Sequence, residues 1–216
     1  MDSTRITIQG FTINGGIYGI FCADQSICRL KGNTIEGDVG VNRSRAVLTG
    51  NVIENSAGDG LQIGAASQAS TNGDTIQGHA GSGVVVGGGS FLRETATTVQ
   101  GNSGFGLLIG DNATLSTGGG NVITGNADTG VFVERASMAS FGNGDVVTAK
   151  GYGLTEYGGD GVAINNLSFG RFAPNVNISG NFSGTDVNCR QPLAATEIDG
   201  SIGGDDELRR TVAAFE

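Results

Sequence analysis

Short runs of alternating hydrophobic residues recur along this chain, and a glycine comes directly before each run. Gly60 precedes the run at 61–63, and Gly83 precedes the run at 84–86. The glycines of the series are Gly19, Gly40, Gly60, Gly83, Gly106, Gly130 and Gly161. They lie 21, 20, 23, 23, 24 and 31 residues apart. Such short apolar runs indicate β-strands, and their near-constant spacing indicates an internal repeat.

Two further elements accompany each run. One is an Ile or Val preceded two residues earlier by a small polar residue: Asn33, Asn51, Asp74, Thr97, Asn121 and Asp145. The other is a small or apolar position six residues past the first run: Cys28, Ala69, Leu92, Leu115 and Ala139. Three inward segments in about 23 residues describe a coil with three faces, and stacked coils about 4.8 Å apart form parallel sheets. We expect the Asn and Asp residues to cap backbone N–H groups at a sharp bend and to tolerate left-handed backbone there.

The predicted fold is therefore all-β, a single-stranded right-handed parallel β-helix (a β-solenoid) of about seven coils over residues 1–181. No helical pattern separates the strands, which excludes a doubly wound α/β sheet, and a β-propeller would need a period near 40. Residues 182–216 are expected to form an irregular segment that ends in a short helix at 205–215. This segment would cap the open end of the coil stack or lie on its outer face.

Composition narrows the class of partner. The chain has 40 Gly, only 2 Pro and a formal net charge of −9. An acidic protein disfavours binding to nucleic acid or to an anionic membrane, and no apolar run is long enough to span a bilayer. The first residues do not resemble a signal peptide, so we expect that a leader and earlier coils were removed from a longer parent. The alternative is that translation starts at Met1.

The repeat resembles the right-handed β-helix family, the pectate-lyase-like superfold. The resemblance rests on the phrase at 32–35 followed by Gly40-Val41, repeated at 120–126 and Gly130-Val131, and it covers about residues 3–181. It implies a family of polysaccharide lyases, glycan epimerases, phage tailspikes and non-catalytic secreted proteins. In catalytic members, sugar-binding and catalytic residues project outward from one sheet, with carboxylates for Ca²⁺ and a Lys or Arg as base.

The outward residues of the first strand carry no such pattern here. They are predicted to be Phe21, Asn42, Gln62, Val85, Leu108, Phe132 and Ala163. Val85, Leu108 and Phe132 are consecutive and apolar, and an outward apolar stripe is seldom left in water. Either another part of the chain covers this stripe, or it is a subunit or ligand interface.

The long interval between Gly130 and Gly161 is the candidate for a functional insertion. Residues suited to the base chemistry of β-elimination lie in or near it: Lys150, Tyr157, Arg171 and Glu134. Asp160 and Glu156 are the carboxylates suited to holding Ca²⁺. The alternative is a solvated loop with ordinary surface charges.

The remaining reactive residues give weaker signals. His79, the sole histidine, is interpreted as a surface turn residue rather than a catalytic one. Cys22 and Cys28 are predicted to point inward within one coil, where a disulfide and two buried thiols fit equally well. Cys189 should lie too far along the stack to reach them.

The sequence thus favours an exported, secreted or cell-surface β-helix module without a cofactor, with a binding or structural role towards glycans or protein partners. The first alternative is a lyase or epimerase that acts on an acidic polysaccharide through the 150–161 region. The second is a spacer that forms homo-oligomers through the apolar stripe.

Overall fold

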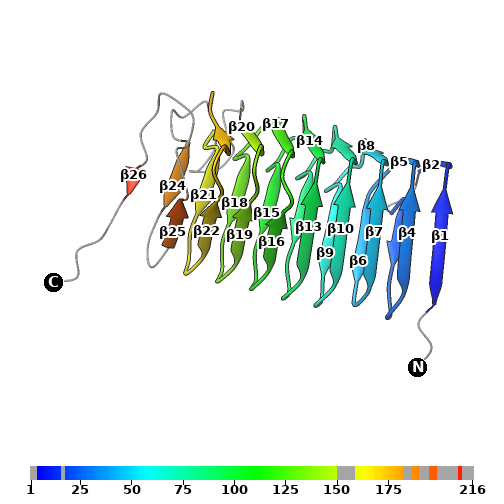
Figure 1. Ribbon diagram of the computed structural model, residues 1–216. Coiled ribbons are helices and arrows are strands. Elements are labelled where there is room, and N and C mark those ends of the chain that lie inside the picture. The colour runs from blue at the N-terminus through cyan, green and yellow to red at the C-terminus, as the bar shows by residue number, and fades with distance from the viewer. Residues whose placement is uncertain are drawn as a thin grey trace.

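The chain forms a right-handed coil of short strands whose successive turns stack into three parallel sheets (Figure 1). The structure is a computed structural model and describes residues 4–15, 18–149, 159–181, 186–189, 195–198 and 209–210. Within these residues all regular structure is β, which confirms the predicted parallel β-helix. The same residues contain no helix that is long and apolar enough to cross a membrane.

Each turn contributes one strand to each sheet, here called A, B and C. Sheet A contains β1 (Arg5–Gln9), β4 (Ile27–Lys31), β7 (Arg45–Thr49), β10 (Gln68–Asn72), β13 (Phe91–Thr95), β16 (Thr114–Thr117), β19 (Met138–Phe141), β22 (Phe169–Phe172) and β25 (Ala195–Ile198). Sheet B contains β2 (Thr12–Asn14), β5 (Thr34–Glu36), β8 (Val52–Glu54), β11 (Thr75–Gln77), β14 (Thr98–Gln100), β17 (Val122–Asn126), β20 (Val146–Ala149) and β23 (Asn177–Ile178). Sheet C contains β3 (Ile20–Cys22), β6 (Val39–Asn42), β9 (Leu61–Gly64), β12 (Val84–Val86), β15 (Leu107–Ile109), β18 (Val131–Val133), β21 (Val162–Ile164), β24 (Val187–Cys189) and β26 (Arg209–Arg210).

The predicted interior rows are present. Cys28, Ala69, Leu92, Leu115 and Ala139 are all buried and lie in one register row of sheet A, which Ala46 completes. The inward-pointing aliphatic residues of sheet B are likewise fully buried: Ile35, Ile53, Ile76, Val99, Ile123, Val147 and Ile178. Because each row repeats a similar side chain at strand spacing, the core is a set of aliphatic columns parallel to the coil axis.

The glycine series needs one correction. Val39 pairs with Ile20 and with Leu61, so Asp38 occupies the position that Gly19 and Gly60 hold in the neighbouring turns. Gly40 lies two residues further on, at an outward position of β6. The second turn is shorter than the others. Aligning it by Gly40 therefore places its residues two positions out of register with the neighbouring turns.

A buried polar ladder marks the bend from sheet A to sheet B. The backbone N–H of Asn33 donates to Oδ1 of Asn51 at 3.0 Å, and that of Asn51 donates to Oδ1 of Asp74 at 2.7 Å. The N–H groups of Thr97 and Asn121 are bound in the same way by the following turn. The predicted capping is therefore confirmed. The left-handed backbone lies one residue earlier, at Gly32, Gly50, Gly73, Ala96, Gly120 and Gly144.

A second ladder lies at the bend from sheet B to sheet C and contains the histidine. The N–H of Ser56 donates to Nδ1 of His79 at 3.1 Å, and the N–H of His79 donates to Oδ1 of Asn102 at 3.0 Å. Asn102 is bound in turn by Asn126. His79 is buried, so the prediction of a surface turn residue is wrong, and burial lowers the pKa of its imidazole below the usual value. The imidazole of His79 serves here as a hydrogen-bond acceptor for a backbone N–H group of the preceding turn.

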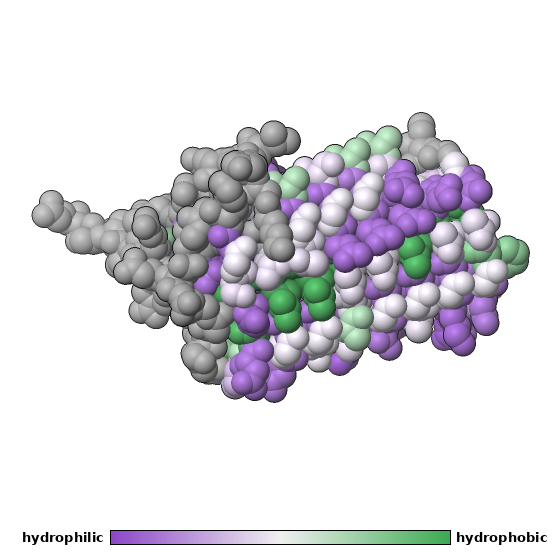
Figure 2. Space-filling view, turned by 90° about the horizontal axis from the view of Figure 1, so that it is seen from above, coloured by the Kyte–Doolittle hydropathy of each residue, from purple (hydrophilic) through white to green (hydrophobic). Residues whose placement is uncertain are grey.

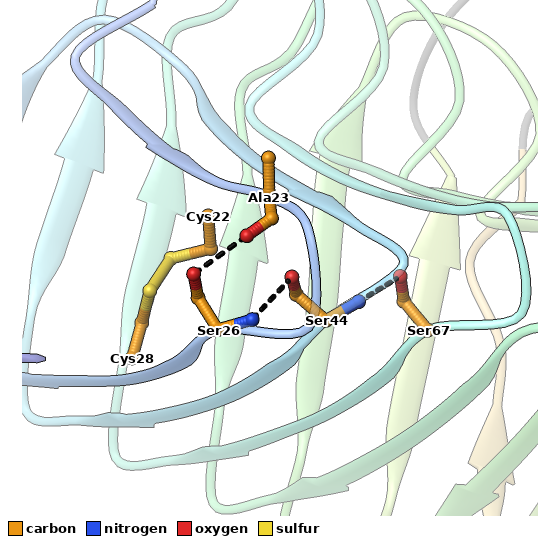
Figure 3. The surroundings of a disulfide bond; sticks show 6 residues. All are labelled: Cys22, Ala23, Ser26, Cys28, Ser44 and Ser67. Atoms are coloured by element: carbon orange, nitrogen blue, oxygen red, sulfur yellow. Dashed lines mark hydrogen bonds between the residues drawn. A yellow bond between two sulfur atoms is a disulfide. The ribbon is translucent and has the colours of Figure 1, made fainter. Parts of the chain in front are cut away.

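A serine ladder lies at the third bend, from sheet C back to sheet A (Figure 3). The N–H of Ser26 donates to Oγ of Ser44 at 3.2 Å, and the N–H of Ser44 donates to Oγ of Ser67 at 3.2 Å. The same bend carries the Cys22–Cys28 disulfide, with the two Cα atoms 6.3 Å apart. This resolves the open choice between a disulfide and two thiols in favour of the disulfide. Cys189 lies on β24, at the opposite end of sheet C from β3.

The serine ladder has one gap, and filling it should stabilise the protein. The N–H of Ser67 donates to Oγ of Ser90, and the N–H of Ala113 donates to Oγ of Ser137, but Ala113 itself offers no hydroxyl to the turn before it. The N–H of Ser90 already donates to the carbonyl oxygen of Gly87 at 3.2 Å, so Ala113→Ser adds a second acceptor there. We therefore expect a gain of about 0.5 kcal/mol in unfolding free energy, measured by denaturant titration. Ser67→Ala, which opens a second gap, should lose a similar amount. A stabilised Ser67→Ala would contradict this account of the ladder.

The sheets continue past residue 181. Strand β24 pairs with β21, and β25 pairs with β22. The helix expected at 205–215 is not supported where the structure describes it, because Arg209–Arg210 form strand β26, paired with Asn188–Cys189. The rest of that range lies outside the described residues. A stretch that follows a strand edge gains more from extending the ladder than from a short isolated helix.

Candidate functional site

The outer face of sheet C carries a single central row of side chains. In register it reads Phe21, Gly40, Gln62, Val85, Leu108, Phe132, Ala163 and Asn188. The predicted row is correct except at the second turn, where Gly40 takes the place assigned to Asn42. Asn42 instead pairs with Gly64. The row therefore has a gap without a side chain between Phe21 and Gln62.

An aromatic pair occupies this gap. The rings of Tyr18 and Phe21 lie 5.0 Å apart at 45°, and they are 47% and 53% exposed. A Cβ atom on Gly40 would lie 2.5 Å from the Phe21 ring, so the ring lies over the backbone of the next turn. Glycine at position 40 is what allows this close approach.

These rings border a groove of about 350 Å³ on sheet C. Its lining includes the amide side chains of Asn42 and Gln62 and the glycines Gly64 and Gly87. Nε2 of Gln62 donates to Oδ2 of Asp38 at 3.2 Å, which fixes the orientation of the amide. An aromatic edge with amide side chains beside it offers both stacking and hydrogen bonding to a ligand.

The charge near the groove is negative. Asp38 is buried, its Oδ1 has no hydrogen-bond partner, and burial raises the pKa of its carboxyl group. Arg43 follows Asn42 in sequence, but its guanidinium binds Oδ1 of Asp24 at 2.7 Å. Among the described residues that line the groove there is no Lys, Arg or His.

The apolar stripe continues from the groove along the same row. Val85 and Leu108 are half-buried, whereas Phe132 is only 6% exposed. The ring of Phe132 stacks on Phe105, with centroids 5.2 Å apart and 12° between the planes. The stripe predicted from Val85, Leu108 and Phe132 does point outward, but the bend residue Phe105 packs on its Phe132 end.

Sheet B carries a second, polar groove of about 360 Å³. Nε2 of Gln77 donates to Oε2 of Glu54 at 2.9 Å, and Nε2 of Gln100 donates to Oε1 of Gln77 at 2.8 Å. Figure 2 shows a hydrophilic row along the coil beside a row of near-neutral and hydrophobic residues. The amides of this groove bind one another, so they are less available to a ligand than those of sheet C.

The residues predicted for lyase chemistry are not brought together where they are described. Arg171 is exposed on β22 of sheet A, and Glu134 follows β18 at the bend from sheet C to sheet A. Asp160 is buried before β21 and accepts a hydrogen bond from Nδ2 of Asn188 at 2.7 Å. Lys150, Glu156 and Tyr157 lie outside the described residues. In the described ranges no three His, Cys, Asp or Glu side chains group as metal ligands do.

A buried glutamate is the functional group that sequence reasoning missed. Glu94 on β13 points into the coil between Thr71 and Thr117, is 0% exposed, and has no hydrogen-bond partner at either carboxyl oxygen. Burial raises its pKa to about 8, and the charges of Asp145 and Asp74 act in the same direction. The signal was present in the sequence, because Leu92 and Glu94 alternate with outward residues on one strand.

Comparisons with known proteins agree on the architecture. The family model described as the right-handed beta helix region matches residues 1–169. Among solved structures, the crystal structure of pectate lyase Pel9A matches with a TM-score of 0.58 and 9% sequence identity, over 95% of this chain and 68% of that one. No curated protein sequence matches this chain. At that identity the structural likeness concerns the fold.

Proposed function

Because this chain belongs to the right-handed beta helix family, whose fold is compatible with many activities, we propose its function from its own groove: a glycan-binding module. The observation that carries the proposal is the exposed Tyr18–Phe21 pair beside the amides of Asn42 and Gln62. Sugar rings present C–H faces that pack on aromatic rings and hydroxyl groups that bind amides. The groove offers both along a straight sheet face.

The chemistry of the groove favours binding over cleavage. β-Elimination needs a base within hydrogen-bond reach of the substrate proton. The described lining offers neither Lys, Arg nor His, and its one tyrosine, Tyr18, packs its ring against Phe21 as part of the aromatic edge. The Cys22–Cys28 disulfide supports export, since such bonds persist in oxidising compartments. We therefore propose a secreted or cell-surface module that holds a polysaccharide chain.

Removal of the aromatic edge tests this function. We expect Phe21→Ala to weaken binding of a responsive hexasaccharide about tenfold, measured by isothermal titration against neutral and acidic oligosaccharides, because one stacking contact contributes about 1–1.5 kcal/mol. Phe91→Ala is the matched control, since Phe91 is 38% exposed on β13 of sheet A, away from the groove. Equal losses of hexasaccharide affinity in Phe21→Ala and Phe91→Ala would contradict the proposal.

A second variant blocks the groove without removing a contact. A Cβ atom on Gly64 meets nothing within 4 Å, and its backbone is not left-handed. Gly64→Thr therefore projects into the groove from a strand in which threonine is favoured. We expect the affinity for the hexasaccharide to fall while the melting temperature stays the same or rises.

Release of unsaturated products from an acidic oligosaccharide by the wild-type protein would support the lyase alternative instead.

A further inference from the structure

We propose that the sheet C groove selects an uncharged glycan chain and discriminates against polyuronates. This inference rests on the proposed glycan-binding function and specifies its ligand class. It is argued from the charges around the groove and from the groups that are available to a ligand.

A uronate chain carries one carboxylate per residue and needs cations to bind it. The described lining of the groove has none. The guanidinium of Arg43 is engaged by Asp24 at 2.7 Å, so a uronate would have to compete with a carboxylate already in place. An anionic polymer therefore finds no unpaired positive group on this lining.

The ionisable group behind the groove is itself an acid. Oδ2 of Asp38 accepts a hydrogen bond from Nε2 of Gln62 at 3.2 Å, while the other carboxyl oxygen of Asp38 is buried and has no hydrogen-bond partner. Asp59 adds negative charge near Asp38. With the chain's formal net charge of −9, the local and the overall field both oppose an approaching polyanion.

The groups that remain suit hydroxyl and N-acetyl substituents. Gln62 uses its Nε2 on Asp38, which leaves its carbonyl oxygen as an acceptor, and Asn42 offers an amide at the end of β6. Neutral amides bind hydroxyl groups as both donors and acceptors. The rings of Tyr18 and Phe21 favour sugars whose flat faces are not charged.

The test compares three hexasaccharides of matched length: cellohexaose, chitohexaose and hexagalacturonate. We expect at least one neutral hexamer to bind at least tenfold more tightly than hexagalacturonate at low ionic strength. Added salt should narrow this difference, because it screens the repulsion of the anionic chain. The variant Asp38→Asn keeps the shape of the side chain and removes its acid group. We expect it to bind hexagalacturonate more tightly, so that the affinity difference between the neutral and the acidic hexamer becomes several-fold smaller.

The outcomes separate the two proposals. Preferential binding of hexagalacturonate that is lost in Phe21→Ala would overturn the selectivity and leave glycan binding intact. Absence of binding to all three hexamers would overturn both. If Asp38→Asn proves unstable, the salt dependence of the wild-type protein still decides, since an attractive electrostatic contribution would make uronate binding weaken with salt.

Discussion

Replacing Glu94 by glutamine is expected to raise the free energy of unfolding by about 3 kcal/mol at pH 7, taking 1.36 kcal/mol per pKa unit. The folded-state pKa of Glu94 is about 8, against an ordinary value of 4.5. Between these two values the native state holds a proton that the unfolded chain has released. Stability therefore falls as pH rises across this window, and glutamine removes that cost.

The pH profile is the decisive measurement. Urea unfolding of wild type and Glu94→Gln at several pH values should coincide near pH 4 and diverge steadily up to about pH 8. Nearby acceptors support the new amide, since Thr71 and Thr117 flank position 94. Glu36→Gln, on the exposed end of β5, is the control and should leave the profile unchanged. Parallel profiles for wild type and Glu94→Gln would disprove the assignment of a buried neutral acid.

Gly130→Ala is expected to cost more than about 3 kcal/mol, in the range of severe overpacking. The added Cβ would lie 2.6 Å from the carbonyl oxygen of Gly161 and 2.6 Å from Cγ1 of Val147. That oxygen accepts the N–H of Val131, so it cannot move without loss of a ladder hydrogen bond.

The matched control is Gly64→Ala, three turns earlier on the same sheet, where the new methyl group meets nothing within 4 Å. Its stability should change little or rise slightly, because alanine is favoured over glycine inside a strand. Thermal unfolding of both variants separates steric exclusion from a general effect of losing glycine. Similar melting temperatures for the two would show that the close contact at Gly130 is not the reason for glycine there.

The contrast between these glycines explains why the fold could be predicted from sequence. Gly60, Gly83, Gly130 and Gly161 recur because a Cβ at each would collide with the carbonyl oxygen of the following turn. A steric requirement that recurs in most turns produces a periodic pattern of glycines in the sequence. The polar residues that cap each bend form a second periodic pattern, which has the same repeat length as the glycines.

The candidate groove has no corresponding periodic pattern in the sequence. It depends on Phe21 lying over Gly40, and therefore on the register of a turn in which Asp38 replaces the expected glycine. Tyr18 stands directly before the repeated glycine, at a position that Asp59 and Ser82 hold in later turns, so nothing in the repeat predicts an aromatic ring there. The Gln62–Asp38 contact joins residues 24 apart in sequence, and only the stacking of turns brings them together. Features that occur once cannot be found by periodicity, however regular the scaffold.

The three bend ladders all have the same direction. In each, a backbone N–H donates to a side chain of the turn that follows it: Asn33 to Asn51, Ser26 to Ser44 and His79 to Asn102. The chain is synthesised from its N-terminus. The backbone N–H groups at the bends of each turn therefore have no acceptor until the following turn has been synthesised. Maturation on the ribosome should lag synthesis by one turn, and a pause in translation would hold one incomplete rung rather than a collapsed domain.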